Sequence, residues 1–321
     1  MTFKEIVEQD RVKQQLLTAI EKDMVSHAYL FLGEEGIGKY TMAKAFAEAL
    51  LCSDSEKGCG RCSSCKSVSK GTHPDLLELG LDEHETSLKI SQIRQMITQL
   101  SVKPYQSERR IAIIRGGDRM TTEAQNALLK SLEEPERFNI FIITANDAEG
   151  ILQTIRSRCQ VLTFEPISPQ GIRQVLTAKG YTDQDELETA LYDSEGSIGK
   201  ALEFFENRDL EALKIEALDV FYAILRGDIC KIFDFAEKIS KDKRDSLEVL
   251  TFLIVWFHDM ALVLTETDFP KTPYQGKQEQ FAAVLSPERN DRIVKVLFEL
   301  MDYLDYNVNL RLQWESAMLK I

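Results

Sequence analysis

Two groups of residues in this 321-residue chain have types and spacings that could do chemistry. One is a glycine loop, Gly33-Glu34-Glu35-Gly36-Ile37-Gly38-Lys39, and the other is a set of four cysteines, Cys52, Cys59, Cys62 and Cys65. A loop of the first kind binds phosphate through backbone N–H groups and a lysine. Four thiolates can enclose a metal ion.

The glycine loop predicts the backbone shape of a P-loop without the residues that hold Mg²⁺. Gly33, Gly36 and Gly38 let N–H groups wrap a phosphate at the start of a helix, and Lys39 reaches the outer phosphates. The next position should carry the Ser or Thr hydroxyl that binds Mg²⁺, but it is Tyr40. A phenol oxygen lies too far from the loop to replace that hydroxyl.

An acidic residue at the end of a neighbouring strand is missing as well. The strand expected at 111–114 runs into Arg115-Gly116-Gly117-Asp118, so that Asp118 comes three residues late. A working P-loop ATPase needs such a residue to hold the Mg²⁺ shell. We therefore expect a degenerate loop that keeps its shape and does not turn over ATP and Mg²⁺, while weak nucleotide binding through Lys39 stays open.

The four cysteines predict a closed, structural zinc site. Cys59, Cys62 and Cys65 are separated by two-residue gaps that let their sulfurs reach one ion, and Cys52 supplies the fourth thiolate. Four protein ligands leave no open position, so the metal would not be catalytic. The alternative is an accidental cluster of reduced thiols. The basic residues around the cluster are either a contact for DNA or a partner, or solvated loop charges; they are Lys57, Arg61, Lys66 and Lys70.

Short strands alternate with helices over residues 1–166. Strands are expected at 28–32, 76–79, 111–114, 140–143 and 161–164, and helices at 12–20, 39–51, 90–100 and 122–132. Strands separated by helices predict a parallel sheet that is covered on both faces. The glycine loop then follows the first strand and opens a helix, as a P-loop must.

The β pattern stops at Glu165-Pro166-Ile167-Ser168-Pro169, the best candidate for a boundary. Beyond it we expect three short helical segments, and then longer helices with apolar stripes at Leu247, Leu250, Ile254, Phe257 and Leu264 and at Ile293, Val296, Leu300 and Leu304. The predicted fold is an α/β P-loop domain over residues 1–166 with a zinc module at about 52–75, a small helical domain over 167–208, and an all-α domain over 209–321.

The charge and hydropathy of the chain argue against an autonomous nucleic-acid-binding protein and against a membrane protein. The formal net charge is −13, the opposite sign to most autonomous nucleic-acid binders, so any DNA contact should be local or shared with partners. The longest strongly apolar run, 252–257, is far below the roughly 18 residues that span a bilayer. The first eight residues carry no basic or apolar signal region. We therefore expect a soluble, cytoplasmic protein without a membrane partner.

Together these residues resemble the clamp-loader subunits of the bacterial DNA polymerase III holoenzyme, which are AAA+ proteins. The likeness covers nearly the whole chain in order: 3–9, 27–31, the glycine loop, the cysteine module with 71–75, 126–135, Thr154-Ile155-Arg156-Ser157-Arg158-Cys159, and 307–312. The resemblance implies that the small helical domain is a lid and that the C-terminal domain is a collar for oligomerisation.

The resemblance also implies a mechanism. Clamp-loader subunits form a five-membered ring that opens a sliding clamp and places it on primed DNA, with ATP at the subunit interfaces. The arginine of Ser-Arg-Cys points at the nucleotide of the neighbouring subunit, so Arg158 would be an arginine finger in trans. The implied partners are the tau or gamma ATPases, delta, the sliding clamp and primed DNA. Without the family, Arg158 would be an ordinary surface or ion-paired arginine.

One further departure points to a subunit with little or no ATP hydrolysis of its own. Active relatives carry an arginine that senses ATP shortly after a Gly-Ser pair, whereas Gly196-Ser197 is followed by Ile198-Gly199, with Lys200 adjacent. By the same resemblance, the polymerase activity of the holoenzyme resides in another subunit. Two rival interpretations remain: a motor subunit that hydrolyses ATP, and a zinc-dependent DNA-binding protein outside any ring.

Overall fold

The computed structural model describes residues 2–54, 57–81, 85–265, 273–304 and 309–321. Its contacts separate two compact units: Met1–Tyr181 with Ser194–Gly199, and Thr182–Asp193 with Lys200–Ile321. The segment expected to form a lid, 167–208, is thereby shared between the two units. The division into three domains stays a prediction.

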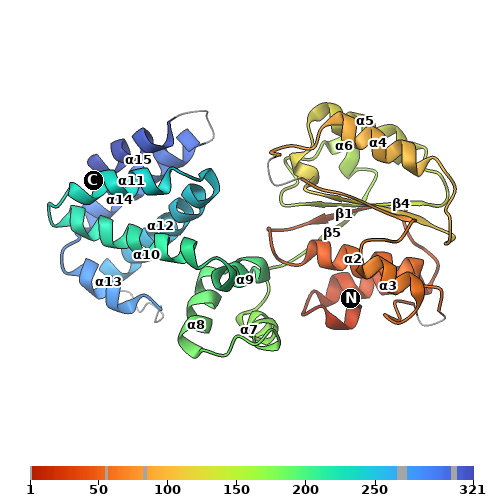
Figure 1. Ribbon diagram of the computed structural model, residues 1–321, viewed down its shortest axis with the longest axis horizontal. Coiled ribbons are helices and arrows are strands. Elements are labelled where there is room, and N and C mark those ends of the chain that lie inside the picture. The colour runs from red at the N-terminus through yellow and green to blue at the C-terminus, as the bar shows by residue number, and fades with distance from the viewer. Residues whose placement is uncertain (1, 55–56, 82–84, 266–272, 305–308) are drawn as a thin grey trace. The chain divides into compact units, whose positions relative to one another are not determined.

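A five-stranded parallel sheet forms the centre of the first unit (Figure 1). Its strands lie in the order β2-β3-β4-β1-β5. β1 is flanked on both sides, because Leu30 lies opposite Ile143 of β4 and opposite Val161 of β5. The strands are β1 (Ala28–Leu32), β2 (Leu76–Leu79), β3 (Arg110–Arg115), β4 (Asn139–Ala145) and β5 (Gln160–Thr163). The predicted parallel α/β sheet is confirmed.

Helices cover both faces of this sheet, as Figure 1 shows for α2 and α3 on one side and α4, α5 and α6 on the other. Strand residues alternate between two cores: Phe31 and Ile113 pack with α1 and α2, whereas Leu30 and Ile114 pack with α4 and α5. Burial on both faces explains why the strands are continuously apolar. The helical elements of this unit are η1 (Phe3–Glu5), α1 (Asp10–Glu21), α2 (Lys39–Leu51), α3 (Ser63–Ser69), α4 (Ile90–Leu100), η2 (Gly117–Arg119), α5 (Thr122–Glu133), α6 (Gln153–Arg156) and α7 (Pro169–Ala178).

The described residues of the second unit form helices joined by short connections. They include α8 (Gln184–Asp193), α9 (Ile198–Glu206, which begins in the first unit), α10 (Arg208–Leu225), α11 (Cys230–Ile239), α12 (Lys243–Leu264), α13 (Gln275–Ala282), α14 (Pro287–Leu304) and α15 (Leu310–Leu319). The predicted helical C-terminal region is confirmed.

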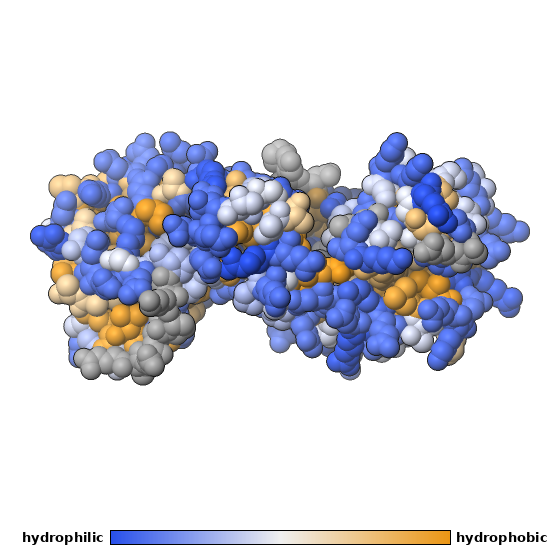
Figure 2. Space-filling view, turned by 90° about the horizontal axis from the view of Figure 1, so that it is seen from below, coloured by the Kyte–Doolittle hydropathy of each residue, from blue (hydrophilic) through white to orange (hydrophobic). Residues whose placement is uncertain are grey.

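Hydrophilic residues predominate on the face of the chain that Figure 2 shows, with smaller apolar areas between them.

Helix α12 supplies the centre of the second core. The rings of Trp256 and Phe281 lie 4.5 Å apart between centroids, and Phe257 packs on both of them. Trp314 Nε1 donates a hydrogen bond of 2.6 Å to Ser246 Oγ, which satisfies two buried polar groups. By length and composition α12 could cross a bilayer. Its buried side chains belong to the core of this unit, and we therefore interpret it as a bundle helix.

Replacing Phe257 tests this core. Its side chain is fully buried, so Phe257→Ala should lower the free energy of unfolding by about 3–5 kcal/mol through lost burial and a cavity. Phe298→Ala is the matched control, because Phe298 is 53% exposed and its loss should change stability by only about 0.5 kcal/mol. Urea denaturation followed by tryptophan fluorescence measures both variants, and equal effects would contradict the assigned core.

Candidate functional site

The glycine loop joins the end of β1 to the start of α2. Gly33, Gly36 and Gly38 have φ values of 148°, 78° and 96°, a region that residues with a Cβ atom adopt at a cost. Lys39 is the first residue of α2, and its side chain is buried. The four residues predicted for the loop therefore come together as the P-loop spacing requires.

The amine of Lys39 is held by the chain itself. Nζ donates to the carbonyl oxygen of Gly33, to that of Glu34 at 2.5 Å, and to Oδ1 of Asn146 at 3.0 Å. Burial lowers the pKa of Lys39, while the carboxylates of Asp118 and the loop glutamates raise it. Asn146 directly follows β4, and its role here was not evident from the sequence.

A stacked pair lies where a P-loop ATPase would arrange its Mg²⁺ ligands. The guanidinium of Arg115, at the end of β3, lies over the ring of Tyr40 at 4.8 Å from the centroid. Tyr40 Oη donates to Glu78 Oε2 at 3.1 Å, and Lys44 Nζ lies 3.6 Å from Glu78 Oε1. A hydroxyl and a carboxylate are thus replaced by a ring and a cation that attract each other. The positive charge of Arg115 opposes a divalent cation at this place.

Asp118 does not substitute for the missing acid. It lies in η2, beyond the strand end that Arg115 occupies, and its Cβ packs against Gly150. Its Oδ1 atom is buried and has no hydrogen-bond partner among the described residues. The side chain contributes negative charge near Lys39.

The four cysteine sulfurs converge at one point, all within 4.8 Å of one another. Cys52 Sγ lies 3.7 Å from that of Cys59 and 3.9 Å from that of Cys62, and the sulfurs of Cys59 and Cys65 are 3.9 Å apart. Four sulfurs at about 2.3 Å from a tetrahedral zinc ion would be about 3.8 Å apart. The spacing therefore fits a tetrahedral ion held by four thiolates.

The backbone around the cysteines also suits a thiolate cluster. The N–H of Cys62 donates to Cys59 Sγ, and the N–H of Cys65 donates to Cys62 Sγ, both at 3.4 Å. Burial opposes ionisation of Cys62, but N–H donors from Cys65 and Ser53 lower the pKa of its thiol to about 6. Cys62 is therefore ready to bind a cation at neutral pH.

His73 belongs to a different arrangement from the cysteine cluster. It is buried, and its Nδ1 accepts the N–H of Asp75 at 3.1 Å. The carboxylate of Asp75 accepts the N–H groups of Tyr105, Gln106 and Ser107 at 2.6, 2.9 and 2.9 Å. Although burial opposes it, these three bonds lower the pKa of Asp75. Burial lowers the pKa of His73, which favours its neutral form.

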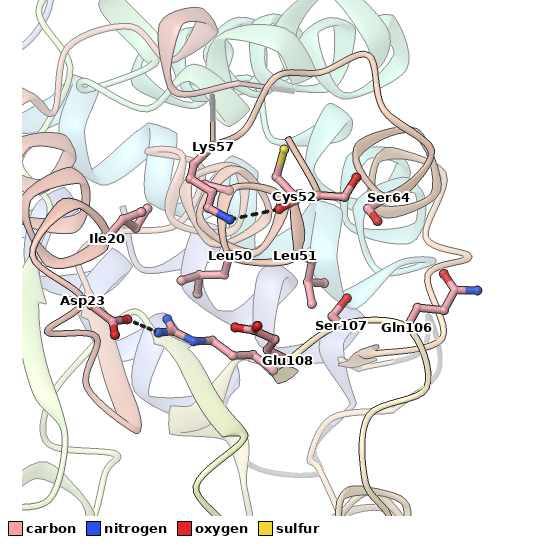
Figure 3. Close-up of a pocket in the computed structure, with 13 residues that line it drawn as sticks. Ile20, Asp23, Leu50, Leu51, Cys52, Lys57, Ser64, Gln106, Ser107 and Glu108 are labelled. Atoms are coloured by element: carbon pink, nitrogen blue, oxygen red, sulfur yellow. Dashed lines mark hydrogen bonds and ion pairs between the residues drawn. The ribbon is translucent and has the colours of Figure 1, made fainter. Parts of the chain in front are cut away.

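A pocket of about 350 Å³ lies beside the cysteine module (Figure 3). The end of α1, the end of α2 and the loop before β3 line it. Arg109 pairs with Asp23 across one wall at 2.5 Å, and Lys57 Nζ donates to the carbonyl oxygen of Cys52 at 3.2 Å. Charges of both signs line the pocket, and Asp23, Arg109 and Lys57 already have partners within the chain, so we assign it no ligand.

Arg158 lies between α6 and β5 with its guanidinium anchored at three points. Nη2 lies 2.7 Å from Glu133 Oε1, and Nη1 donates to the carbonyl oxygen of Thr154 at 2.8 Å and to Ser157 Oγ at 3.4 Å. About a third of its side chain is exposed. The position of Arg158 is thus defined by α5 and α6, and the contact with Glu133 was not evident from the sequence.

Known proteins are similar to this chain in sequence and in fold. The family model for the delta subunit of DNA polymerase III matches residues 8–168. The delta prime subunit of DNA polymerase III from Bacillus subtilis (strain 168) is 32% identical over 223 residues, which is 69% of this chain and 67% of that protein. The chain belongs to the delta prime family of DNA polymerase III subunits.

The chain is also similar to more distant proteins. The tau subunit of DNA polymerase III from Bacillus subtilis (strain 168) is 26% identical over 349 residues, 99% of this chain and 61% of tau. A gamma-subunit-related protein of DNA polymerase III from Thermotoga maritima has the same fold, with a TM-score of 0.54 and 17% identity over 95% of this chain and 97% of that one. The sheet and helices of a DNA polymerase III subunit are therefore present here.

Metal analysis tests the cysteine cluster of this delta prime chain. Protein purified with zinc should contain about one zinc ion per chain, because four thiolates complete a tetrahedral site. Cys59→Ser should reduce the zinc content to near zero, since its sulfur lies close to two others. Cys230→Ser is the control, because Cys230 is exposed and outside the cluster. Full retention of zinc by Cys59→Ser would contradict the site.

The pH dependence of stability tests the environment of His73. Its pKa is lowered in the folded delta prime chain, so below its ordinary value of about 6.5 the unfolded chain binds more protons. The free energy of unfolding should then fall as the pH decreases from about 6.5 to 5. His73→Asn should reduce that slope, because it removes the buried imidazole. Urea denaturation across this range measures the slopes; equal slopes in wild type and His73→Asn would contradict the assignment.

Proposed function

We propose that this chain is the delta prime stator of a bacterial clamp-loader ring. In this role it presents Arg158 to the ATP of a neighbouring ATPase subunit and hydrolyses little or no ATP itself. Membership of the delta prime family supports its place in DNA polymerase III. The observation that carries the non-hydrolytic part is the stack of Arg115 on Tyr40, a cation and a ring where Mg²⁺ needs oxygen ligands.

The partners follow from this role. They are the tau or gamma ATPases and delta in the ring, and the sliding clamp and primed DNA through the assembly, in the cytoplasm. The similarity of this chain to tau over nearly its whole length supports a ring of related subunits. The helical C-terminal region acts as the collar, α7 to α9 act as the lid, and the cysteine module holds a structural zinc ion.

Arg158 is suited to act on a phosphate from outside its own subunit. A guanidinium near the transferring phosphoryl group stabilises the charge that develops there. Its present partner, Glu133, is 47% exposed on its side chain, and exposed ion pairs are worth about 0–1 kcal/mol. Arg158 can therefore exchange Glu133 for a phosphate at little cost.

Neither rival function has comparable support. A motor subunit would need Mg²⁺ ligands, and the positions of Tyr40 and Arg115 oppose this. An autonomous zinc-dependent DNA-binding protein would carry a basic face, whereas the formal net charge is −13.

Substitution of Arg158 in the reconstituted clamp loader tests the proposal. Arg158→Ala should leave assembly intact and slow ATP turnover at the facing site by about 10³-fold or more, because the finger supplies transition-state stabilisation of that order. Steady-state ATP turnover of the whole ring should fall by the fraction that the facing site contributes to it. Arg137→Ala is the control, because Arg137 is an exposed arginine outside the Ser157-Arg158-Cys159 segment.

Two results would contradict the stator role. Unchanged ATPase activity in the assembled Arg158→Ala ring would remove the finger assignment. ATP turnover by the isolated chain that Lys39→Ala abolishes would favour the motor subunit instead.

A further inference from the structure

The glycine loop contacts a turn from much later in the chain. We propose that this P-loop is a docking site for the turn Ser194–Gly199, which holds the loop in the way that a nucleotide holds it in an ATPase. Loop and turn both belong to the first unit. The inference goes beyond the stator role, since it concerns only the contacts of the loop and does not depend on Arg158.

Four consecutive carbonyl groups of the loop are satisfied from within the chain. Lys39 Nζ donates to the first two, those of Gly33 and Glu34. Ser197 Oγ donates to the carbonyl oxygen of Glu35 at 2.9 Å. The N–H of Gly199 donates to the carbonyl oxygen of Gly36, also at 2.9 Å. The backbone of the loop is therefore fixed without any ligand.

Two glycines make this approach possible, and each depends on the other. A Cβ atom on Gly36 would lie 2.9 Å from the Cα of Gly199, and a Cβ atom on Gly199 would lie 2.7 Å from the Cα of Gly36. Both distances are too short for carbon atoms that are not bonded. Any residue with a Cβ atom at position 199 would displace the turn from the loop.

The turn is also anchored on its other side. Ser194 and Ser197 are fully buried, and the N–H of Ser197 donates to the carbonyl oxygen of Ser194 at 2.8 Å. The carbonyl oxygen of Gly196 accepts the N–H of Ile167 at 2.9 Å. The turn is thus held between the segment that follows β5 and the loop that follows β1.

These contacts give the loop a function that needs no nucleotide. Gly36 lets the turn approach the loop, because it has no Cβ atom. Lys39 donates hydrogen bonds to the carbonyl groups of Gly33 and Glu34. A phosphate would have to draw Lys39 away from both carbonyls, which opposes binding. The P-loop therefore acts as a permanent contact site for the turn, here called the joint. ATP should leave the stability of this joint unchanged.

Hydrogen exchange in the full-length chain tests the joint. Gly199→Ala should raise amide exchange in residues 33–38 and 194–200 together, because the added Cβ atom forces the two backbones apart. Gly276→Ala is the matched control, since Gly276 is also helical but has open space around its Cβ position. Increased exchange confined to 194–200 would overturn the proposal.

A second variant and a ligand complete the test if Gly199→Ala does not fold. Ser197→Ala removes the hydrogen bond to the carbonyl oxygen of Glu35 without a steric clash. It should raise exchange in the same two segments about two- to twelvefold, the equivalent of roughly 0.5–1.5 kcal/mol. ATP with Mg²⁺ should leave exchange of residues 33–38 in the wild type unchanged. Marked protection of the wild-type loop by ATP, or unchanged exchange in Ser197→Ala, would overturn the proposal.

Discussion

Pairing of β1 with β4 on one side and β5 on the other brings three distant segments to one edge of the sheet. The carboxyl ends of parallel strands meet at that edge. The N–H of Gly33 donates to Ala145, and the N–H of Phe164 donates to Leu32, so the loop begins at a fixed place between its neighbours. Asn146 then reaches Lys39, and the segment after β5 holds the turn that contacts the loop. The arrangement of the glycine loop, Asn146 and the turn therefore depends on this strand order.

The residues around the glycine loop that differ from those of a working ATPase site contact one another or the loop itself. The cation of Arg115 stacks on Tyr40, and the phenol of Tyr40 is hydrogen-bonded to Glu78, so these side chains stabilise one another. Gly199 lacks the side chain that would keep the turn away from Gly36. Restoring one residue of an ATPase site would therefore leave the others in conflict with it, because contacting residues are energetically coupled. In the stator role that we propose, such a subunit would contribute a fixed surface to its ring and would take no part in cycles of nucleotide binding.

The cysteine module, unlike the glycine loop, is stabilised by contacts between residues that are close in sequence. Between α2 and β2 the chain makes an excursion whose helix α3 is only seven residues long and buries Ser64, Cys65 and Val68. Such a segment has little apolar area to bury, and a metal ion held by the four cysteines would supply the missing stabilisation. Its ligands are close in sequence, so the site forms locally. This is the reason why the convergence of the four cysteines could be predicted from their spacing alone.

The sequence by itself determined the features that arise from neighbouring residues: the five strands, the helix after the glycine loop, the loop conformation and the clustering of the four cysteines. It could not choose the buried face of α12, because that helix is apolar on several sides. Of the predicted stripe, Leu250 and Phe257 are buried but Leu247 is 41% exposed, while Val249, Leu253, Trp256 and Met260 also enter the core. Only the tertiary structure decided that Arg115 meets Tyr40, that Glu133 holds Arg158 and that Gly199 contacts Gly36. These contacts depend on the order of strands in the sheet and on close packing between remote segments, and no local periodicity encodes either of them.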